Sequence, residues 1–325
     1  MTDGRIGRRT FLTTVSAAAA ATALTSCVPR RRATAGAPPG AVQFGIQTHP
    51  QHTRWADILP VWQEADDLGI DSAFVFDHFI PIRSDPSGPC LEGWTLLSAL
   101  LAKTDRIHGG ILVTGNTYRH PAVLAKMAST VDQVSGGRLV LGMGAGWFEL
   151  EHKAYGIPFH TPGGRARRLA ESVEIVKRLF TEPRVSFAGK YYRLEDAPFE
   201  PKGVQRPHPP ILIGGMGPKV VQPLAARHAD IWHFFAPDDV DETRRTIARF
   251  DELVRAAGRE PGAVRKSVSL RPPDVAGKDA KAVRARIRSL ADAGVGLFIL
   301  SLSAPFDRGL LRRFAKDIVP AARAA

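Results

Sequence analysis

Short apolar runs alternate along the chain with longer stretches of helical periodicity, from residue 42 to the C-terminal region. Apolar runs of about four to eight residues between glycines or polar residues predict buried strands, and apolar residues three or four apart predict helices. The predicted strands are Val42–Thr48, Ser72–Asp77, Ile107–Val113, Arg138–Gly142, Pro210–Ile213, Asp230–Phe234, Lys266–Leu270 and Leu297–Leu302. The predicted helices are Arg54–Leu68, Ala122–Val134, Arg165–Phe180, Asp239–Ala257 and Ala280–Ala293. This alternation predicts a parallel sheet covered by helices.

Eight such units close most economically into an α/β structure, the (β/α)8 TIM barrel, and a doubly wound open sheet is the alternative. An open sheet that binds a nicotinamide dinucleotide carries a Gly-x-Gly-x-x-Gly turn after an early strand, and the glycines from Gly142 to Gly146 have the wrong spacing for it. We therefore expect a barrel over residues 41–325. The long connection from Gly146 to Pro209, between the fourth and fifth strands, predicts an insertion with a helix and a hairpin around Ala188–Gly189.

The segment from Arg119 to Trp147 combines a helix pattern with a strand that ends in glycines. Pro121 suits a first helical turn, and Gly136 and Gly137 end the helix. The apolar side chains expected on one face are Val123, Leu124, Met127, Val131 and Val134. After a short apolar strand come Gly142, Gly144 and Gly146. These glycines either expose backbone to a flat or anionic ligand or only turn the chain tightly.

Polar residues follow several predicted strands, at the barrel end where function collects. Asp77 and His78 close the apolar run Phe74–Phe76, and a histidine there can exchange a proton near neutral pH or can simply bond a neighbouring carbonyl. The other strand-end candidates are Thr114, Gly115, Asn116, Gly144, Gly146, Trp147, Gly214, Gly215 and Met216. Backbone amides at a glycine turn before a helix suit a phosphate, although such a turn is also an ordinary connector.

The composition indicates a globular protein and favours a small molecule as its partner. The chain has 325 residues, 44% of them hydrophobic, and a net charge of +12. The first 40 residues carry six arginines against Asp3, or +5, which leaves +7 for the remainder. Basic residues do not interleave with aromatics as in single-strand binders, so we expect no nucleic acid partner. A moderately basic fold favours an anionic small molecule.

The N-terminal residues have the pattern of a targeting signal. Arg8 and Arg9 precede a mild, alanine-rich run from Phe11 to Ser26, followed by Cys27. This resembles a twin-arginine signal that ends in a lipobox, and the run is too short for a stable membrane span. We expect residues 1–27 to be a signal, Cys27 to carry lipid and residues 28–40 to be a flexible tether. The protein would then be exported and held on the outer face of the cell membrane by its lipid alone, with secretion as the alternative.

Several motifs in order point to a known family. They are FVFDHF (Phe74–Phe79), LVTGNTYRHP (Leu112–Pro121), the segment Arg119–Trp147, EHKAYGIPF (Glu151–Phe159), YRLEDAPFEP (Tyr192–Pro201) and RPHPPILIGGMGP (Arg206–Pro218). Over roughly residues 42 to 320 the chain resembles the luciferase-like monooxygenase superfamily, specifically its branch that uses the deazaflavin coenzyme F420.

The resemblance implies roles for the strand-end residues. His78 would donate or accept a proton beside the deazaflavin, and Asp77 would orient it or contact the cofactor. Thr114, Gly115 and Asn116 would support the ring, at a place where relatives often have a non-proline cis peptide. Gly144, Gly146 and Trp147 would form another wall. Gly214, Gly215 and Met216 would hold the cofactor phosphate.

One departure from the family affects the substrate. In the sugar-phosphate dehydrogenases of this superfamily a glutamate acts as an acid at the position of Trp147, so oxidation of glucose 6-phosphate by that mechanism is not expected here. Trp147 would instead stack on a ring or close off the substrate pocket. An FMN-dependent monooxygenase and a non-catalytic binding lipoprotein are the alternative functions.

Neither a metal site nor a disulfide is expected. The pairs Glu149/His152 and His49/His52 lack a second half with ligand spacing. Only two cysteines are present, and lipidation of Cys27 would leave Cys90 alone. The expected partner is a small-molecule substrate, and a homodimer is left open.

Overall fold

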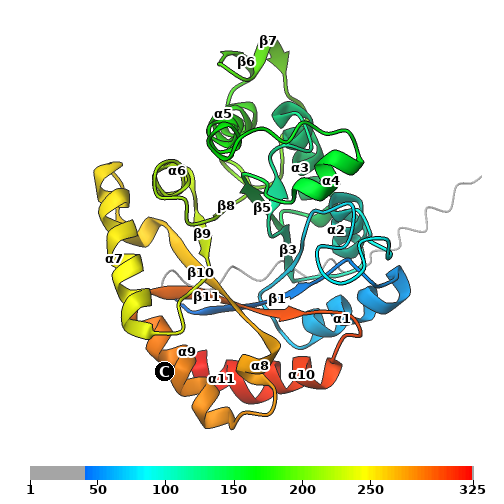
Figure 1. The fold of residues 1–325 in the computed structure, drawn as a ribbon, viewed down its shortest axis with the longest axis vertical. Helices are drawn as coiled ribbons and strands as arrows, with labels where there is room; N and C mark the ends of the chain where they lie inside the picture. Colours follow the sequence, from blue (N-terminus) through cyan, green and yellow to red (C-terminus); the bar gives the residue numbers. More distant parts are fainter. Residues whose placement is uncertain (1–40, 324–325) are drawn as a thin grey trace, which may run out of the picture. The chain divides into compact units, whose positions relative to one another are not determined.

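The computed structural model describes residues 41–323, and these form a closed parallel barrel surrounded by helices (Figure 1). The barrel strands are β1 (Gln43–Thr48), β2 (Ser72–Val75), β3 (His108–Ile111), β4 (Thr114–Gly115), β5 (Leu139–Gly144), β8 (Ile211–Gly214), β9 (Ile231–Phe234), β10 (Arg265–Leu270) and β11 (Val295–Leu302). β4 continues the course of β3, and the barrel closes through the β1–β11 and β3–β5 pairs. The predicted TIM barrel is confirmed.

Helices connect successive strands. They are α1 (Trp55–Asp67), α2 (Gly93–Ala102), α3 (Pro121–Ser135), α4 (Glu149–Ala154), α5 (Pro162–Thr181), α6 (Val221–His228), α7 (Val240–Ala256), α8 (Pro272–Val275), α9 (Ala280–Asp292), α10 (Arg308–Arg313) and α11 (Val319–Arg323), with the 3-10 turn η1 (Pro261–Ala263) and the π-helical turn η2 (Phe314–Ile318). All five predicted helices are present, with ends that differ by at most three residues. None of the helices in residues 41–323 is long and apolar enough to cross a membrane.

The barrel interior is filled by its own small cluster of side chains. The members are Phe74, Leu112, Val140, Leu212, Ile231, Leu297 and Ile299. A much larger cluster packs between the strands and the surrounding helices. Because side chains alternate across a strand, the next inward positions lie above this plug, at the carboxyl end of the barrel. These positions are available to line a site.

The predicted buried face of helix α3 is confirmed at Leu124, Met127 and Val131 and is wrong at Val123 and Val134. Val123 and Val134 are 54% and 50% exposed, whereas Ala125 and Ala128 are fully buried with Leu124 and Val131. The helix packs against α2 and α5, and its alanines allow close approach of these neighbours. The sequence pattern placed Val123 and Val134 on the buried face because both are large and apolar. The small alanines that make the actual contacts have low hydrophobicity and did not stand out in the pattern.

The predicted insertion follows β5 and contains α4, α5 and an antiparallel hairpin of β6 (Arg184–Ala188) and β7 (Arg193–Pro198). The hairpin stands at the top of Figure 1, beyond α5 and away from the barrel. Helix α5 packs on α3, and α4 follows directly on the glycine-rich end of β5. Among the residues that line the cavity described next, those after β5 are Ala145, Gly146 and Trp147, which directly precede α4.

Candidate functional site

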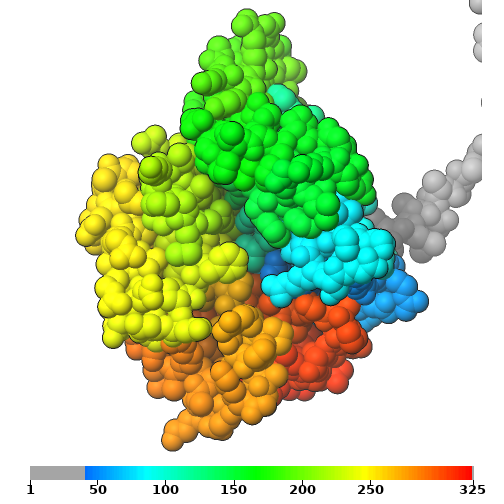
Figure 2. All heavy atoms as spheres, in the orientation of Figure 1, coloured from blue at the N-terminus to red at the C-terminus, as the bar shows by residue number. Residues whose placement is uncertain are grey.

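A cavity of about 1250 Å³ opens at the carboxyl end of the barrel. Every strand of the barrel, or the segment that directly follows it, contributes residues to the cavity wall, from Gln47 on β1 to Ser301 on β11. In the space-filling view this face of the molecule is hollowed between the insertion, the loop after β2 and the C-terminal half of the chain (Figure 2). The volume exceeds that of a typical small-ligand pocket and has room for a ring-sized cofactor together with a substrate.

A β-bulge presents Val113 to this cavity. Gly110 pairs with Val140 and Thr114 pairs with Met143, so β3 and β4 carry one more residue than β5 between these pairs. The Leu112–Val113 peptide bond within the bulge is cis, and both residues line the cavity. This is one residue before the place where family resemblance suggested such a peptide.

Three glycines make room for the bulge. A Cβ atom on Gly142 would lie 1.8 Å from the Ile111 carbonyl oxygen, one on Gly144 would lie 2.5 Å from Val113 Cγ2, and one on Gly214 would lie 3.0 Å from Val113 Cγ1. The glycines of β5 and β8 are thus required by close packing. Gly144 and Gly214 also line the cavity, and their exposure to a ligand stays a prediction.

Of the three residues Thr114, Gly115 and Asn116, only Gly115 lines the cavity. Thr114 is buried, and its Oγ1 accepts a hydrogen bond of 2.7 Å from Trp94 Nε1. Asn116 is 3% exposed, and its Nδ2 has no hydrogen-bond partner among the described residues. A buried amide donor without a partner is unusual, but Asn116 is not among the residues that line the cavity.

His78 reaches the cavity from the end of β2 and is held from behind by Glu151 on α4. His78 Nδ1 lies 2.6 Å from Glu151 Oε1, and the Phe79 backbone N–H donates to Oε2 at 2.8 Å. Tyr118 O–H donates to the same Oε1 atom. Glu151 is completely buried and His78 is 7% exposed.

These hydrogen bonds keep the Glu151 carboxylate ionised. Burial would raise the pKa of Glu151, but the bonds from His78, Tyr118 and Phe79 outweigh it and lower the pKa below its ordinary value. Cys90 lies nearby, and burial together with Glu151 and Asp77 raises the pKa of its thiol to about 12. The cysteine is therefore an inert thiol.

Asp77 does not orient His78. Its carboxylate is fully buried and pairs with Arg119 through two bonds of 2.6 and 3.1 Å. Arg119 also bonds Glu92, which caps the start of α2 by accepting from the backbone N–H groups of Trp94 and Thr95. The expectation that Asp77 orients the histidine is wrong because Arg119 takes both carboxylate oxygens, and Glu151 has the orienting position instead.

Gly146 and Trp147 form the mouth of the cavity beside His78. Trp147 is 59% exposed, and its ring meets that of His78 edge-on at a centroid distance of 5.7 Å. Arg165 at the start of α5 donates to the Gly146 carbonyl at 3.0 Å and lies over the ring of Phe159. Arg165 therefore fixes the glycine turn and does not belong to an open cationic surface.

The turn after β8 lies at the cavity through Gly214 and Gly215, whereas Met216 is exposed and does not line it. Gly215 has φ +127°, which disfavours a side chain, and its carbonyl accepts from Trp232 Nε1 at 2.9 Å. The turn leads into α6. Cys27, the predicted lipidation site, lies outside the described residues.

Sequence patterns missed the residues that act behind His78. Glu151 and Tyr118 lie inside motifs used for the family resemblance, but nothing in their spacing connects them to His78.

In the described part of the chain no group of three or more His, Cys, Asp or Glu side chains could hold a metal ion. His152 instead bonds Thr117 Oγ1 at 2.6 Å and the Phe148 carbonyl at 2.7 Å.

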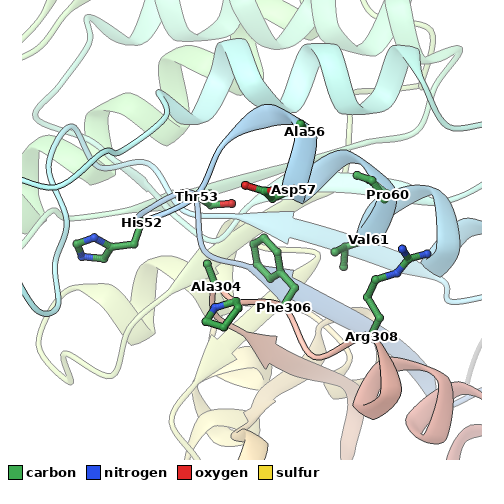
Figure 3. Close-up of a pocket in the computed structure, with 10 residues that line it drawn as sticks. His52, Thr53, Ala56, Asp57, Pro60, Val61, Ala304, Phe306 and Arg308 are labelled. Atoms are coloured by element: carbon green, nitrogen blue, oxygen red, sulfur yellow. The ribbon is translucent and has the colours of Figure 1, made fainter.

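A second cavity, of about 640 Å³, lies between the start of α1 and the segment after β11 (Figure 3). Its charged groups already have partners: Asp57 pairs with Arg54, and Arg308 pairs with Glu64. His52 bonds the Arg83 carbonyl. Every ionisable side chain among the described residues that line this cavity is therefore paired, and the larger barrel-end cavity is the candidate active site.

The chain matches the luciferase-like monooxygenase family over residues 11–317 and belongs to it. An FMNH(2)-dependent dimethylsulfone monooxygenase of Pseudomonas putida is 33% identical over 178 residues, or 55% of this chain and 47% of the relative. An F420-dependent glucose-6-phosphate dehydrogenase of Kineococcus radiotolerans is 33% identical over 211 residues, or 64% of this chain and 61% of the relative. The matches therefore span about half to two thirds of these relatives' length.

Solved structures share the fold. An F420-dependent secondary alcohol dehydrogenase, in complex with an F420-acetone adduct, superposes with a TM-score of 0.77. The alignment has 22% identity and covers 87% of this chain and 99% of that one. Identity at this level supports the barrel architecture alone.

Proposed function

We propose that this protein is an oxidoreductase that uses coenzyme F420 and moves a hydride between that deazaflavin and an organic substrate. One observation carries the proposal: Val113, on its bulge, and His78, which is held by the buried Glu151 carboxylate, line the same cavity. The similarity to F420-dependent relatives supports the choice of cofactor.

The residues present fit such a cofactor. A flat ring system can lie on Leu112, Val113 and the side-chain-free backbone of Gly144 and Gly214, all of which line the cavity. The Gly214–Gly215 turn before α6 is the place for a phosphate. When bound, the deazaflavin supplies or accepts hydride at its C5 position.

The chain itself manages the proton that accompanies the hydride. Because Glu151 holds Nδ1 of His78, proton exchange with the substrate falls to Nε2. The Glu151 carboxylate offsets the charge of the imidazole while it carries the extra proton. Trp147 meets the His78 ring edge-on and adds an apolar surface next to the proton carrier.

A monooxygenase that uses reduced FMN is the second candidate, because the Pseudomonas putida relative has that description. Titration of the full-length protein with F420 and with FMN, each followed by fluorescence quenching, separates the two. We expect micromolar or tighter binding of F420. Tight binding of FMN with none of F420 would overturn the first choice.

Export and lipidation form a separate proposal, which the sequence of residues 1–27 supports. We expect the mature protein to be anchored to the membrane through lipid on Cys27. Replacing Cys27 with Ala should move the protein from the membrane fraction to the soluble fraction, and replacing Arg8 and Arg9 with Lys should block export. Persistent anchoring of the Cys27→Ala variant would contradict lipidation.

A further inference from the structure

The barrel-end cavity has two unlike halves. On β3, β5 and β8 it is lined by Leu112, Val113 and the backbone of Gly144 and Gly214. The strands from β9 round to β1, together with His49 directly after β1, contribute uncharged polar groups, and these residues are called the polar half. They are Gln47, His49, His233, Ser269 and Ser301. The segments that follow β9 and β10 add charged lining residues: Asp238, Arg271, Asp274, Lys278 and Arg286.

Two histidines, each held between two serines, build the polar half. His49 Nε2 lies 3.0 Å from Ser301 Oγ, and its Nδ1 lies 3.0 Å from Ser303 Oγ. His233 Nδ1 lies 2.7 Å from Ser267 Oγ, and its Nε2 lies 3.4 Å from Ser269 Oγ. In each set one serine lines the cavity and the other does not, because Ser301 and Ser269 are lining residues whereas Ser303 and Ser267 are not.

Both imidazoles are neutral at physiological pH. Burial lowers the pKa of His233 to about 4, and burial with a smaller contribution from Arg83 lowers that of His49 to about 4. A serine hydroxyl has one donor and two acceptor sites, so a bond to histidine leaves Ser301 and Ser269 able to bond a ligand as well. The polar half is therefore a set of neutral hydrogen-bonding groups.

Cations are confined to the rim of the cavity. Among the described residues that line it, Arg83, Arg271 and Lys278 are exposed to solvent. Arg286 is half-buried and donates to the Pro237 carbonyl at 3.3 Å. A phosphate or carboxylate placed against the two histidines would lose water without gaining a counter-charge.

We propose that Ser301 and Ser269, supported by His49 and His233, select a substrate whose reacting oxygen is an uncharged hydroxyl or carbonyl group. The inference rests on the oxidoreductase function proposed above and names the class of substrate for it. An uncharged secondary alcohol or ketone fits this half of the cavity, and the phosphate of a sugar phosphate does not. The serines act in binding and specificity, and His78 remains the proton carrier.

The test compares cavity-lining serines with serines that neither line the cavity nor bond its histidines. Ser301→Ala and Ser269→Ala are assayed in the full-length protein with F420. The controls are Ser186→Ala, in the hairpin, and Ser289→Ala, on α9. The substrates are a panel of uncharged secondary alcohols and phosphorylated alcohols of the same carbon skeleton. We expect KM for the uncharged alcohols to rise about 5- to 10-fold in the two lining variants, with kcat and F420 affinity nearly unchanged, and to change less than twofold in the controls.

Two results would overturn this inference: preferential turnover of the phosphorylated alcohols, or equal KM changes in the lining and control variants. Failure of the underlying function gives a different result. In that case the unsubstituted protein does not bind F420 at all, whereas failure of the specificity proposal leaves F420 binding and turnover intact.

Discussion

His78 Nδ1 lies 2.6 Å from Glu151 Oε1 although the two residues are 73 positions apart in the chain. One comes from the end of β2 and the other from α4 of the insertion, so the barrel alone does not complete the pair. The contact fixes the orientation of the histidine ring. Nδ1 is occupied by Glu151, which leaves Nε2 for proton exchange in the proposed reaction. The insertion is therefore part of the active site, through the first helix after β5.

Replacing Glu151 with Gln should lower kcat about 10- to 100-fold while KM and F420 affinity stay nearly constant, because the amide cannot offset the charge of a protonated imidazole. Steady-state kinetics across pH 5 to 9 measure this, and the shape of the kcat profile should change as well. Glu149→Gln is the matched control, since Glu149 lies on the same helix but is exposed and pairs with Lys153. Equal kinetics in the two variants would contradict a role for Glu151 behind His78.

Replacing Gly144 with Ala should displace the bulge, because the new Cβ would lie 2.5 Å from Val113 Cγ2. We expect a loss of about 1–3 kcal/mol in the free energy of unfolding and at least 10-fold weaker F420 binding. Urea unfolding and fluorescence titration measure the two effects. Gly262→Ala is the control, because its Cβ would meet nothing within 4 Å, and a similar loss there would argue against the packing explanation.

Arg119 should matter for stability far more than a surface arginine. Arg119→Met leaves the fully buried Asp77 without its partner, so we expect the free energy of unfolding to fall by about 3 kcal/mol or more. Arg184→Met removes an exposed pair with Asp196 and should leave the free energy of unfolding nearly unchanged. Chemical unfolding of both variants at pH 7 checks the contrast, which a loss of equal size would refute.

Stability should fall when the pH drops from 6.5 towards 4. In the folded protein the pKa values of His49 and His233 are about 4, against 6.5 as the ordinary value. Between these values the unfolded chain binds more protons, so the contribution is complete above pH 6.5 and is lost as the pH falls, by about 3 kcal/mol per histidine. Urea unfolding at pH 7 and pH 4.5 measures the slope. His233→Asn should give a flatter dependence, and an unchanged slope would contradict burial as a neutral ring.

The barrel could be predicted from the sequence because each strand is a short apolar run with clear ends. All eight predicted runs coincide with strands of the barrel. The pattern of residues does not predict the Val113 bulge, since it depends on glycines that lie on β5 and β8, and only the family resemblance indicated an irregular backbone near this place. The α3 face was wrong at Val123 and Val134 because small buried alanines carry little weight in a hydrophobic pattern.

The site residues, too, could be predicted only in part from the sequence. Strand ends identified His78, Gly115, Gly144, Gly146, Trp147, Gly214 and Gly215 as cavity residues. Thr114, Asn116 and Met216 follow strands too, but local backbone direction turns them into the core or to solvent. Partners such as Glu151 for His78 and Arg119 for Asp77 depend on contacts between distant segments, which spacing along one chain does not encode.

Direct hydride transfer between a substrate carbon and F420 is the reaction proposed for this protein. The most direct measurement is incubation of the full-length protein and F420 with secondary alcohols that carry deuterium at the carbinol carbon, followed by mass spectrometry of the reduced cofactor. We predict one deuterium on the F420 formed, and no transfer with the His78→Ala variant. Reduced F420 without deuterium, or turnover that requires FMN and consumes oxygen, would contradict the account.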